Sequence, residues 1–327
     1  MSSDIHYVTL DDMRAASSRI ARVARVTPLL DVSQLAGRPL LLKCENTQPG
    51  GAFKIRGAYN MVAQLTDEQR RRGVITFSSG NHGQAVALAA RELNAPAVVV
   101  MPTTAPQVKV AGTRAFGAEV IFEGTTSTER RTRAEAEGAA RGLTMVPPFD
   151  HTWIIAGQGT AGLEILEQCP AAAAVLVPIG GGGLAAGVSA AIKLSRPSIK
   201  VIGVEPSGAA AMKVSIEAGR AVTLDRTHSI ADGLMPVRPG DLTFAHVRRF
   251  VDEIVTVDDV QIARAVLWLS DRAGVVAEPS GAATVAAALE GMIDIDGTIV
   301  AIISGGNMDG GTLDEMRRLV NHWSPLA

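Results

Sequence analysis

The segment Gly50–Asn60 reads GGAFKIRGAYN and is the most informative stretch of the chain. One lysine, Lys54, stands among small and apolar residues, and glycines on both sides let the backbone approach a ligand closely. Burial of such an ammonium group lowers a lysine pKa by up to about 3–5 units. A neutral amine can attack a carbonyl group and hold it as a Schiff base. A lone lysine more often keeps its charged end in water, so this interpretation depends on the rest of the chain.

Composition limits the classes of protein that the chain can belong to. Its 327 residues are 47% hydrophobic and 20% charged, with a net charge of −2. The length predicts about two domains, and the near-neutral charge disfavours nucleic acid as a partner. No apolar run is long enough to cross a bilayer, and residues 1–10 lack the apolar core of a secretory signal. Cys44 and Cys169 have neither metal-ligand nor disulfide spacing. We expect a soluble cytoplasmic protein with no membrane partner.

Short β-rich runs alternate with helical patterns along the chain. Most runs are continuously apolar, which is typical of parallel strands covered by helices on both faces. The predicted strands are Val74–Phe77, Ala97–Met101, Glu119–Phe122, Leu143–Val146, Ala174–Pro178, Lys200–Val204, Glu253–Val257 and Thr298–Ile303. Thr66 with Gln69, and Asp258 with Gln261, have the spacing of capping boxes at helix starts. The alternation predicts open α/β sheets, in which ligands bind beyond the carboxyl ends of the strands.

Glycine-rich or serine-rich loops lie between these predicted elements. Gly180–Gly183 separates a strand from a helix, and its backbone N–H groups are suited to an anion such as a phosphate. Ser78–Gln84, with the sequence SSGNHGQ, occupies a second strand-to-helix turn and is suited to a carboxylate. Ser304–Asn307 follows the last predicted strand, and Glu278–Gly281 leads into a helix. Together with Lys54, these loops indicate a ligand site.

The glycine-rich loop also permits a different interpretation. Gly181, Gly183 and Ala186 have the spacing of a dinucleotide-binding fingerprint, and Glu205 ends the next predicted strand at about the distance of a ribose-binding acid. This pattern alone indicates a nucleotide-dependent oxidoreductase. It is a weak signal, and it explains none of the other loops.

Taken together, the motifs resemble those of fold-type II pyridoxal 5′-phosphate enzymes, specifically the serine/threonine dehydratase and serine racemase group. The resemblance extends from about Thr27 to Asn307. It rests on FKIRGA from Phe53, SSGNHGQ from Ser78, IAGQGT from Ile155, GGGG from Gly180 and SGGN from Ser304. It implies an α/β fold of the tryptophan synthase β type, with two open, mainly parallel sheets flanked by helices. Residues 73–149 would form a small domain inserted into a larger one of residues 1–72 and 150–327.

The resemblance implies roles for individual residues. Lys54 would hold pyridoxal phosphate as a Schiff base and later move the Cα proton. The cofactor would be bound by Phe53, Lys54, Asn81, Glu278 and Ser304, with Gly180, Gly181, Gly182 and Gly183 at its phosphate. The substrate would be bound by Ser78, Ser79, Asn81 and His82. Ser304 would face the pyridine nitrogen, where a neutral hydroxyl suits elimination better than transamination.

The chain departs from the family pattern near the phosphate and at a cation site. Ala52 stands where the family usually has serine, which removes a contact near the phosphate. In racemase-like members a glutamate and an aspartate six residues later hold a divalent cation. Glu205 matches the first of these positions, but Ala211 occupies the second. We therefore expect no metal.

The implied reaction is dehydration of an L-β-hydroxy amino acid, threonine or serine, to a 2-oxo acid and ammonia. Ser79 keeps serine racemisation open, because racemases use this serine as the acid/base opposite the lysine. A dehydratase for threo-3-hydroxyaspartate is also open, with Arg130 or Arg131 at the distal carboxylate. A catalytically silent amino-acid-binding relative is the non-enzymatic alternative. We expect a homodimer or higher homo-oligomer without an appended effector domain.

Overall fold

Two separate β-sheets organise the chain. The structure is a computed structural model that describes residues 5–78, 80–105 and 107–322. The larger sheet has the order β1-β2-β10-β7-β8-β9, and every neighbouring pair is parallel except β1 with β2. Its strands are β1 (Leu29–Asp31), β2 (Leu40–Cys44), β7 (Ala172–Pro178), β8 (Lys200–Pro206), β9 (Glu253–Val257) and β10 (Thr298–Ile303).

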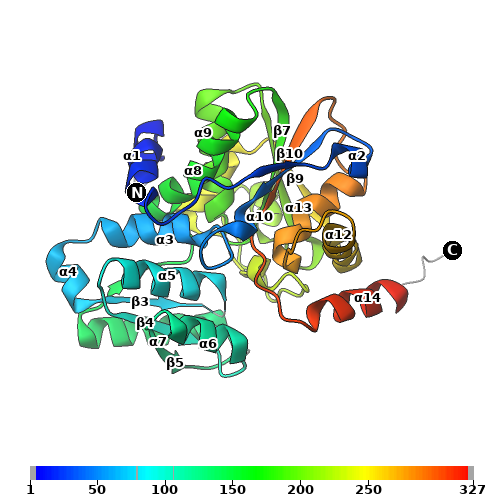
Figure 1. Cartoon of the computed structure of the whole chain (residues 1–327). Helices are drawn as coiled ribbons and strands as arrows, with labels where there is room; N and C mark the ends of the chain where they lie inside the picture. Colours follow the sequence, from blue (N-terminus) through cyan, green and yellow to red (C-terminus); the bar gives the residue numbers. More distant parts are fainter. Residues whose placement is uncertain (1–4, 79, 106, 323–327) are drawn as a thin grey trace.

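The smaller sheet has the order β5-β4-β3-β6 and is entirely parallel. Its strands are β3 (Val74–Phe77), β4 (Ala97–Met101), β5 (Glu119–Phe122) and β6 (Thr144–Met145). In Figure 1 this sheet lies below and to the left of the larger one. The predicted α/β fold with two mainly parallel sheets is confirmed.

Helices cover both faces of each sheet, which explains why most strands are apolar throughout. On the larger sheet, one core contains residues of α12 (Asp259–Asp271) and α13 (Pro279–Leu289). The opposite core contains residues of α8 (Thr152–Gln168) and α9 (Gly183–Ser195). On β4 of the smaller sheet, Val99 packs in the core shared with α3 (Lys54–Ala63) and α5 (Asn81–Glu92), whereas Val98 packs towards α7 (Ser127–Arg141). Successive side chains of a strand point to opposite faces, so both faces are apolar.

The remaining helices lie around these layers (Figure 1). They are α1 (Leu10–Ile20), α2 (Ser33–Ala36), α4 (Asp67–Arg72), α6 (Gln107–Ala115), α10 (Ala211–Ala218), α11 (Asp241–Phe250) and α14 (Thr312–His322), with 3₁₀ turns η1 (Glu45–Thr47), η2 (Ser207–Ala209) and η3 (Asp232–Leu234). The two predicted capping boxes are present at the starts of α4 and α12. Further capping boxes begin α1 and α7.

The sequence pattern did not reveal β1 and β2. Lys43 interrupts the apolar run of β2, yet its side chain is fully buried because its ammonium group pairs with Glu164. A distant partner therefore makes a lysine compatible with a buried strand.

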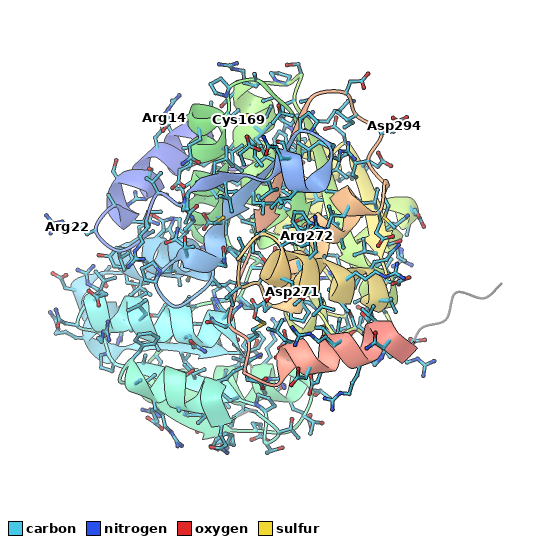
Figure 2. All side chains as sticks on the ribbon, turned by 45° about the vertical axis from the view of Figure 1, so that its right-hand side comes forward. Arg14, Arg22, Cys169, Asp271, Arg272 and Asp294 are labelled. Atoms are coloured by element: carbon cyan, nitrogen blue, oxygen red, sulfur yellow. The ribbon has the colours of Figure 1, made fainter. Side chains whose placement is uncertain are left out.

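The surface carries charges of both signs. Figure 2 shows Arg14, Arg22, Asp271, Arg272 and Asp294 projecting outward from different elements. No helix in the described ranges is long and apolar enough to cross a membrane.

Candidate active site

The predicted site residues lie around the carboxyl ends of β3, β7 and β10, the edge where parallel sheets bind ligands. Lys54 is the first residue of α3, and the preceding Phe53 donates its backbone N–H to the carbonyl of Ser304 at 3.1 Å. Ala52 also forms an isolated β-bridge with Gly305. These contacts bring the start of α3 to the end of β10, although the two are about 250 residues apart in sequence.

The amine of Lys54 is held by a backbone carbonyl. Its Nζ donates to the carbonyl oxygen of Pro148 at 2.8 Å and lies 5.2 Å from the centroid of the Phe53 ring. Burial lowers the pKa of Lys54 to about 8. The partial positive charge at the N-terminus of α3 also disfavours an ammonium group there. A substantial fraction of the amine is therefore neutral at mildly alkaline pH and can act as nucleophile or base.

The glycine-rich loop forms a buried helix start. Gly182 is the N-cap residue of α9, with a φ of 95° that favours glycine, and it makes no side-chain cap. The residues from 181 to 186 are all buried. A buried helix N-terminus without a capping side chain is suited to an anion. Gly181 packs on Phe149, where an added Cβ would lie 2.2 Å from the ring. The loop therefore has the geometry predicted for a phosphate cradle.

The loop after β3 presents a second helix start. Gly80 is the N-cap residue of α5 and makes no side-chain cap. The hydroxyl of Ser78 accepts a hydrogen bond from the N–H of Gly80 at 3.1 Å, which shapes the turn. The first-turn N–H groups of α5 lack helical partners and are suited to a substrate carboxylate. Ser79 lies outside the described residues.

His82 supports this loop through its ring. Its Nε2 lies 3.1 Å from the carbonyl oxygen of Val146. Burial, together with the charge of Lys54, lowers the pKa of His82 to about 3, so the ring is neutral. Nε2 then carries the proton that is donated to Val146, and Nδ1 is left as an acceptor. The backbone N–H of His82, rather than its ring, is the group suited to a carboxylate.

Asn81 connects the two sheets through polar side chains. Its amide nitrogen donates to Glu278, and its oxygen accepts from Nδ2 of Asn307 at 2.9 Å. Glu278 is buried at the start of α13, and burial followed by a neighbouring carboxylate raises the pKa of Glu278 to about 7. The hydroxyl of Ser304 donates to the carbonyl of Ser280 at 3.3 Å. The structure thus brings these predicted cofactor ligands into one hydrogen-bonded region.

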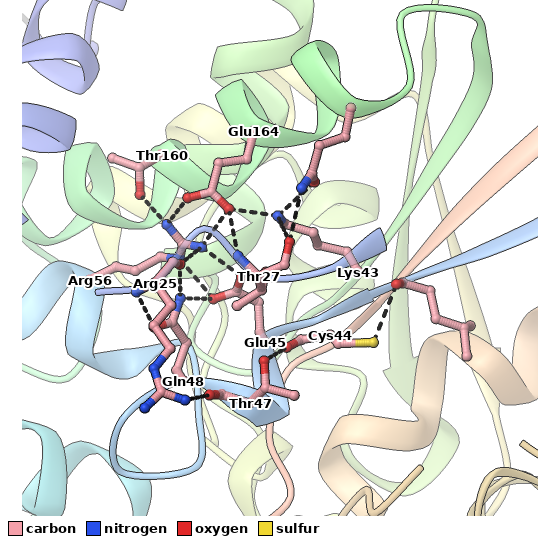
Figure 3. A network of polar contacts seen from close by, with 12 residues as sticks. Arg25, Thr27, Lys43, Cys44, Glu45, Thr47, Gln48, Arg56, Thr160 and Glu164 are labelled. Atoms are coloured by element: carbon pink, nitrogen blue, oxygen red, sulfur yellow. Dashed lines mark hydrogen bonds and ion pairs between the residues drawn. The ribbon is translucent and has the colours of Figure 1, made fainter. Parts of the chain in front are cut away.

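A buried ionic network lies behind α3 and was not predicted from the sequence (Figure 3). Arg56, two residues after Lys54, donates from Nε to Glu45 at 2.7 Å and from Nη1 to Glu164 at 2.6 Å. Lys43 pairs with the same Glu164 at 2.6 Å. Arg56 belongs to the quoted FKIRGA motif, which was the available signal. Its partners lie elsewhere in the sequence, in η1 (Glu45), in α8 (Glu164) and at the backbone carbonyl of Arg25. The network fixes the start of α3.

Comparison with known proteins identifies the family. Residues 20–305 match the family described as "Pyridoxal-phosphate dependent enzyme". The chain belongs to this family. Its membership replaces the dinucleotide-binding interpretation of Gly181, Gly183 and Ala186.

Individual members of this family are similar over almost the whole chain. The chain is 45% identical to the L-threonine ammonia-lyase of Thermotoga maritima over 96% of its own length and 78% of that protein. It is 41% identical to the L-threo-3-hydroxyaspartate ammonia-lyase of Saccharomyces cerevisiae, over 92% of this chain and 94% of that protein. The structure of maize serine racemase superposes with a TM-score of 0.91 at 39% identity, covering 97% of this chain and 99% of that one.

The residues of this chain fit pyridoxal phosphate. The buried start of α9 lacks a capping side chain and offers N–H groups to a phosphate. Lys54 offers an amine whose pKa is lowered to about 8, as a Schiff base with the cofactor aldehyde requires. Two consecutive residues connect these groups, because Pro148 bonds to Lys54 and Phe149 packs on Gly181.

Glu205, near the end of β8, caps the first turn of α10. Its two carboxylate oxygens accept hydrogen bonds from the N–H groups of Met212 at 2.9 Å and Lys213 at 2.8 Å, in the first turn of α10. Ala211, with a methyl side chain, offers no second carboxylate. That the enzyme works without a metal stays a prediction.

Proposed function

We propose that this chain is a pyridoxal-phosphate-dependent ammonia-lyase that converts L-threonine or L-serine to a 2-oxo acid and ammonia. The observation that carries the proposal is the buried amine of Lys54, whose pKa is lowered to about 8 and which bonds to Pro148, while the next residue, Phe149, packs on the uncapped start of α9. The similarity to a protein named L-threonine ammonia-lyase supports the choice of reaction. The Lys54 amine argues against a catalytically silent binding protein.

In the proposed reaction, the first turn of α5 binds the substrate carboxylate and orients the Cα–H bond towards Lys54. Lys54 removes the Cα proton as a general base. Pyridoxal phosphate, when bound, supplies an electron sink for the pair left on Cα. The β-hydroxyl takes up a proton, balanced by the one that Lys54 removes from Cα, and leaves as water. Hydrolysis of the released enamine then gives the 2-oxo acid and ammonia.

Ser304 is proposed to favour elimination over transamination. It would face the pyridine nitrogen, and its hydroxyl donates to the carbonyl of Ser280. A neutral hydroxyl in this position does not stabilise a protonated pyridine ring as a carboxylate would. Less electron density is therefore withdrawn from Cα into the ring, and loss of the β-hydroxyl competes better with transamination.

The site is proposed to lie between two domains, of residues 73–149 and of residues 1–72 with 150–327. Each of the two proposed domains contains one complete sheet, which supports the proposed boundaries. Helix α3 belongs to the larger proposed domain, but its residues Ile55, Ala58 and Val62 pack in the core beneath β3 and β4 of the smaller one. We also propose a cytoplasmic homodimer or higher homo-oligomer. Light scattering of the purified protein measures the oligomer directly.

A borohydride experiment tests the proposed function. Reduction of the purified protein should attach the cofactor to Lys54, as found by mass spectrometry, and the Schiff-base absorbance should be absent from Lys54→Ala. Lys200→Ala, which removes an exposed lysine, is the matched control and should keep both the adduct and the activity. Attachment to a different lysine, or release of no 2-oxo acid from L-threonine or L-serine, would contradict the proposal.

A second candidate substrate, threo-3-hydroxyaspartate, is favoured by the environment of Arg130. In the described residues, Nε of Arg130 is buried without a hydrogen-bond partner, and Nη1 donates to the carbonyl of Thr125 at 3.1 Å. Arg131 instead is exposed and pairs with Glu135. Arg130 lies beyond the carboxyl end of β5, the edge of the sheet that also carries the Ser78 loop. Arg130→Met should lower kcat/KM for hydroxyaspartate about tenfold or more and change that for threonine little; Arg131→Met is the control. An equal loss for both substrates would assign Arg130 to structure.

A further inference from the structure

Three consecutive residues between β6 and α8 each contact a different element at or next to the proposed site. Pro148 accepts the hydrogen bond of the Lys54 amine through its carbonyl oxygen at 2.8 Å. Phe149 packs its ring on Gly181 and its backbone on Gly183. Asp150 accepts hydrogen bonds from three backbone N–H groups at the start of α11, each at 3.0 Å.

The cap that Asp150 provides to α11 comes from far away in the sequence. The N-cap residue of α11 is Gly240, which has no side chain to cap the helix. The carboxylate of Asp150 occupies the space where a side chain would be, since an added Cβ on Gly240 would lie 2.1 Å from Cγ of Asp150. The bonded N–H groups belong to Asp241, Leu242 and Thr243. A carboxylate also complements the positive end of the helix dipole.

The first turn of α11 in turn holds the glycine-rich loop. The hydroxyl of Thr243 donates to the carbonyl oxygen of Gly181 at 2.6 Å, and the N–H of Gly240 lies 3.4 Å from the same oxygen. These contacts form a closed circuit: Asp150 bonds to the start of α11, α11 bonds to Gly181, and Gly181 packs on Phe149, the residue before Asp150. Pro148 extends this circuit to the amine of Lys54.

We propose that Asp150 is a positioning residue, which sets the glycine-rich loop and the Lys54 amine relative to each other. Its carboxylate fixes the segment of Pro148 and Phe149 to the start of α11. The Pro148 carbonyl then accepts one N–H of the Lys54 amine, which restricts the directions open to the rest of that group. This inference rests on the proposed use of pyridoxal phosphate and adds the residue that sets the geometry of its site.

The test compares two helix caps in the holoenzyme. Asp150→Ala removes the cap of α11, and Asp258→Ala removes the cap of α12, where Asp258 accepts from the N–H of Gln261 at 2.8 Å. Both variants are expected to lower the thermal midpoint. Only Asp150→Ala is expected to release pyridoxal phosphate about tenfold faster on dilution into a trapping buffer. It should also shift the phosphorus NMR resonance of the bound cofactor and lower kcat more than it changes KM. Asp150→Asn keeps one acceptor oxygen and should fall between the wild type and Asp150→Ala.

The inference is overturned if the phosphorus resonance and the release rate of Asp150→Ala match those of Asp258→Ala. If Asp150→Ala does not accumulate as folded protein, Asp150→Asn decides by the same two readouts. Neither readout needs a substrate, so an incorrect substrate assignment leaves the test intact. A wild-type protein that binds no pyridoxal phosphate would overturn this inference and the proposed function together. A protein that binds it, with an unaltered Asp150→Ala, would overturn this inference alone.

Discussion

Lys54 occupies a position that disfavours its own charge. Its amine donates to one carbonyl oxygen, and burial lowers the pKa of Lys54 to about 8. The start of α3 adds partial positive charge. The face of the Phe53 ring, 5.2 Å away, attracts a cation and offsets only part of this effect. The buried cation that supports this helix is Arg56, whose charge is balanced by two carboxylates. The structure thus separates a charged residue that fixes the helix from an amine that can become neutral.

Ser79 separates elimination from racemisation. Elimination needs a base only on the Lys54 face, whereas racemisation also needs a proton donor on the opposite face. We expect Ser79→Ala to keep most L-threonine dehydration and to abolish any conversion of L-serine to D-serine, because a positioned acid or base contributes about 10²–10⁴-fold. Chiral chromatography and 2-oxo acid release measure the two activities. Equal loss of both would instead assign Ser79 to binding or loop geometry.

Glu278 should make stability depend on pH. Its pKa is raised from 4.5 to about 7, first by burial. A carboxyl group with a raised folded-state pKa takes up a proton on folding, so stability is lost as the pH rises from about 4.5 through 7. Glu278→Gln removes this charge, and its stability relative to the wild type should rise by up to about 3 kcal/mol between pH 4.5 and pH 8. Urea unfolding at several pH values measures the difference. Glu217→Gln, on an exposed position of α10, is the control, and a pH-independent difference for Glu278→Gln would contradict the expectation.

At the scale of elements, the sequence predicted the strands that are apolar on both faces. β3, β4, β5, β9 and β10 have the predicted bounds. β4 and β10 are almost continuously apolar and buried, and such a run needs no knowledge of its partners. β7 and β8 extend two residues beyond the prediction, and β6 is shorter than predicted. β2 was missed, because Lys43 is made compatible with burial by Glu164, 121 residues away.

Part of the candidate site could also be predicted from the sequence, where its residues stand in contiguous motifs. Lys54, the Ser78 loop and Gly180–Gly183 stand in short contiguous motifs whose composition indicates their chemistry. Asp150 stands in no such motif, since the N–H groups that it caps lie 91–93 residues later. The part of the site formed by pairing between distant segments requires the structure.

The buried network of Figure 3 should dominate the stability of the α3 anchor. Arg56→Met leaves Glu45 and Glu164 facing each other with one of their two cations removed, and we expect a loss of about 3–5 kcal/mol. Arg131→Met removes an exposed pair with Glu135 and should cost less than about 1 kcal/mol. Urea unfolding compares the two variants. A loss for Arg56→Met as small as that for Arg131→Met would show that the network contributes little to folding.

At the scale of the whole molecule, the two sheets are joined by the apolar packing of α3 beneath β3 and β4 and by polar side chains near the proposed site. Asn81, which follows β3, bonds to Glu278 and Asn307 from the larger sheet's side. Lys109 of α6 forms an ion pair with Asp232 of η3. η3 also borders the glycine-rich loop, because the carbonyl of Gly233 lies 3.0 Å from the position of a Cβ on Gly180. Polar contacts that join the sheets therefore involve residues of the proposed site and of its borders.

We predict that the two domains close over a bound substrate, and that the Lys109–Asp232 pair favours the closed arrangement in a salt-dependent manner. The two side chains are 17% and 48% exposed, so the pair is worth about 0.2–1 kcal/mol rather than the larger value of a buried pair. Lys109→Met should therefore raise KM about two- to fivefold and change kcat less, because closure assists substrate retention more than the chemical step. Between about 0.05 and 0.5 M salt, the KM of the wild type should rise towards that of the variant, since salt screens exposed charges. Asp232→Asn and the double variant complete a thermodynamic cycle, in which the effects of the two single substitutions on KM should not add. Parallel salt dependence in wild type and variant, or additive losses in the cycle, would show that this ion pair does not contribute to closure.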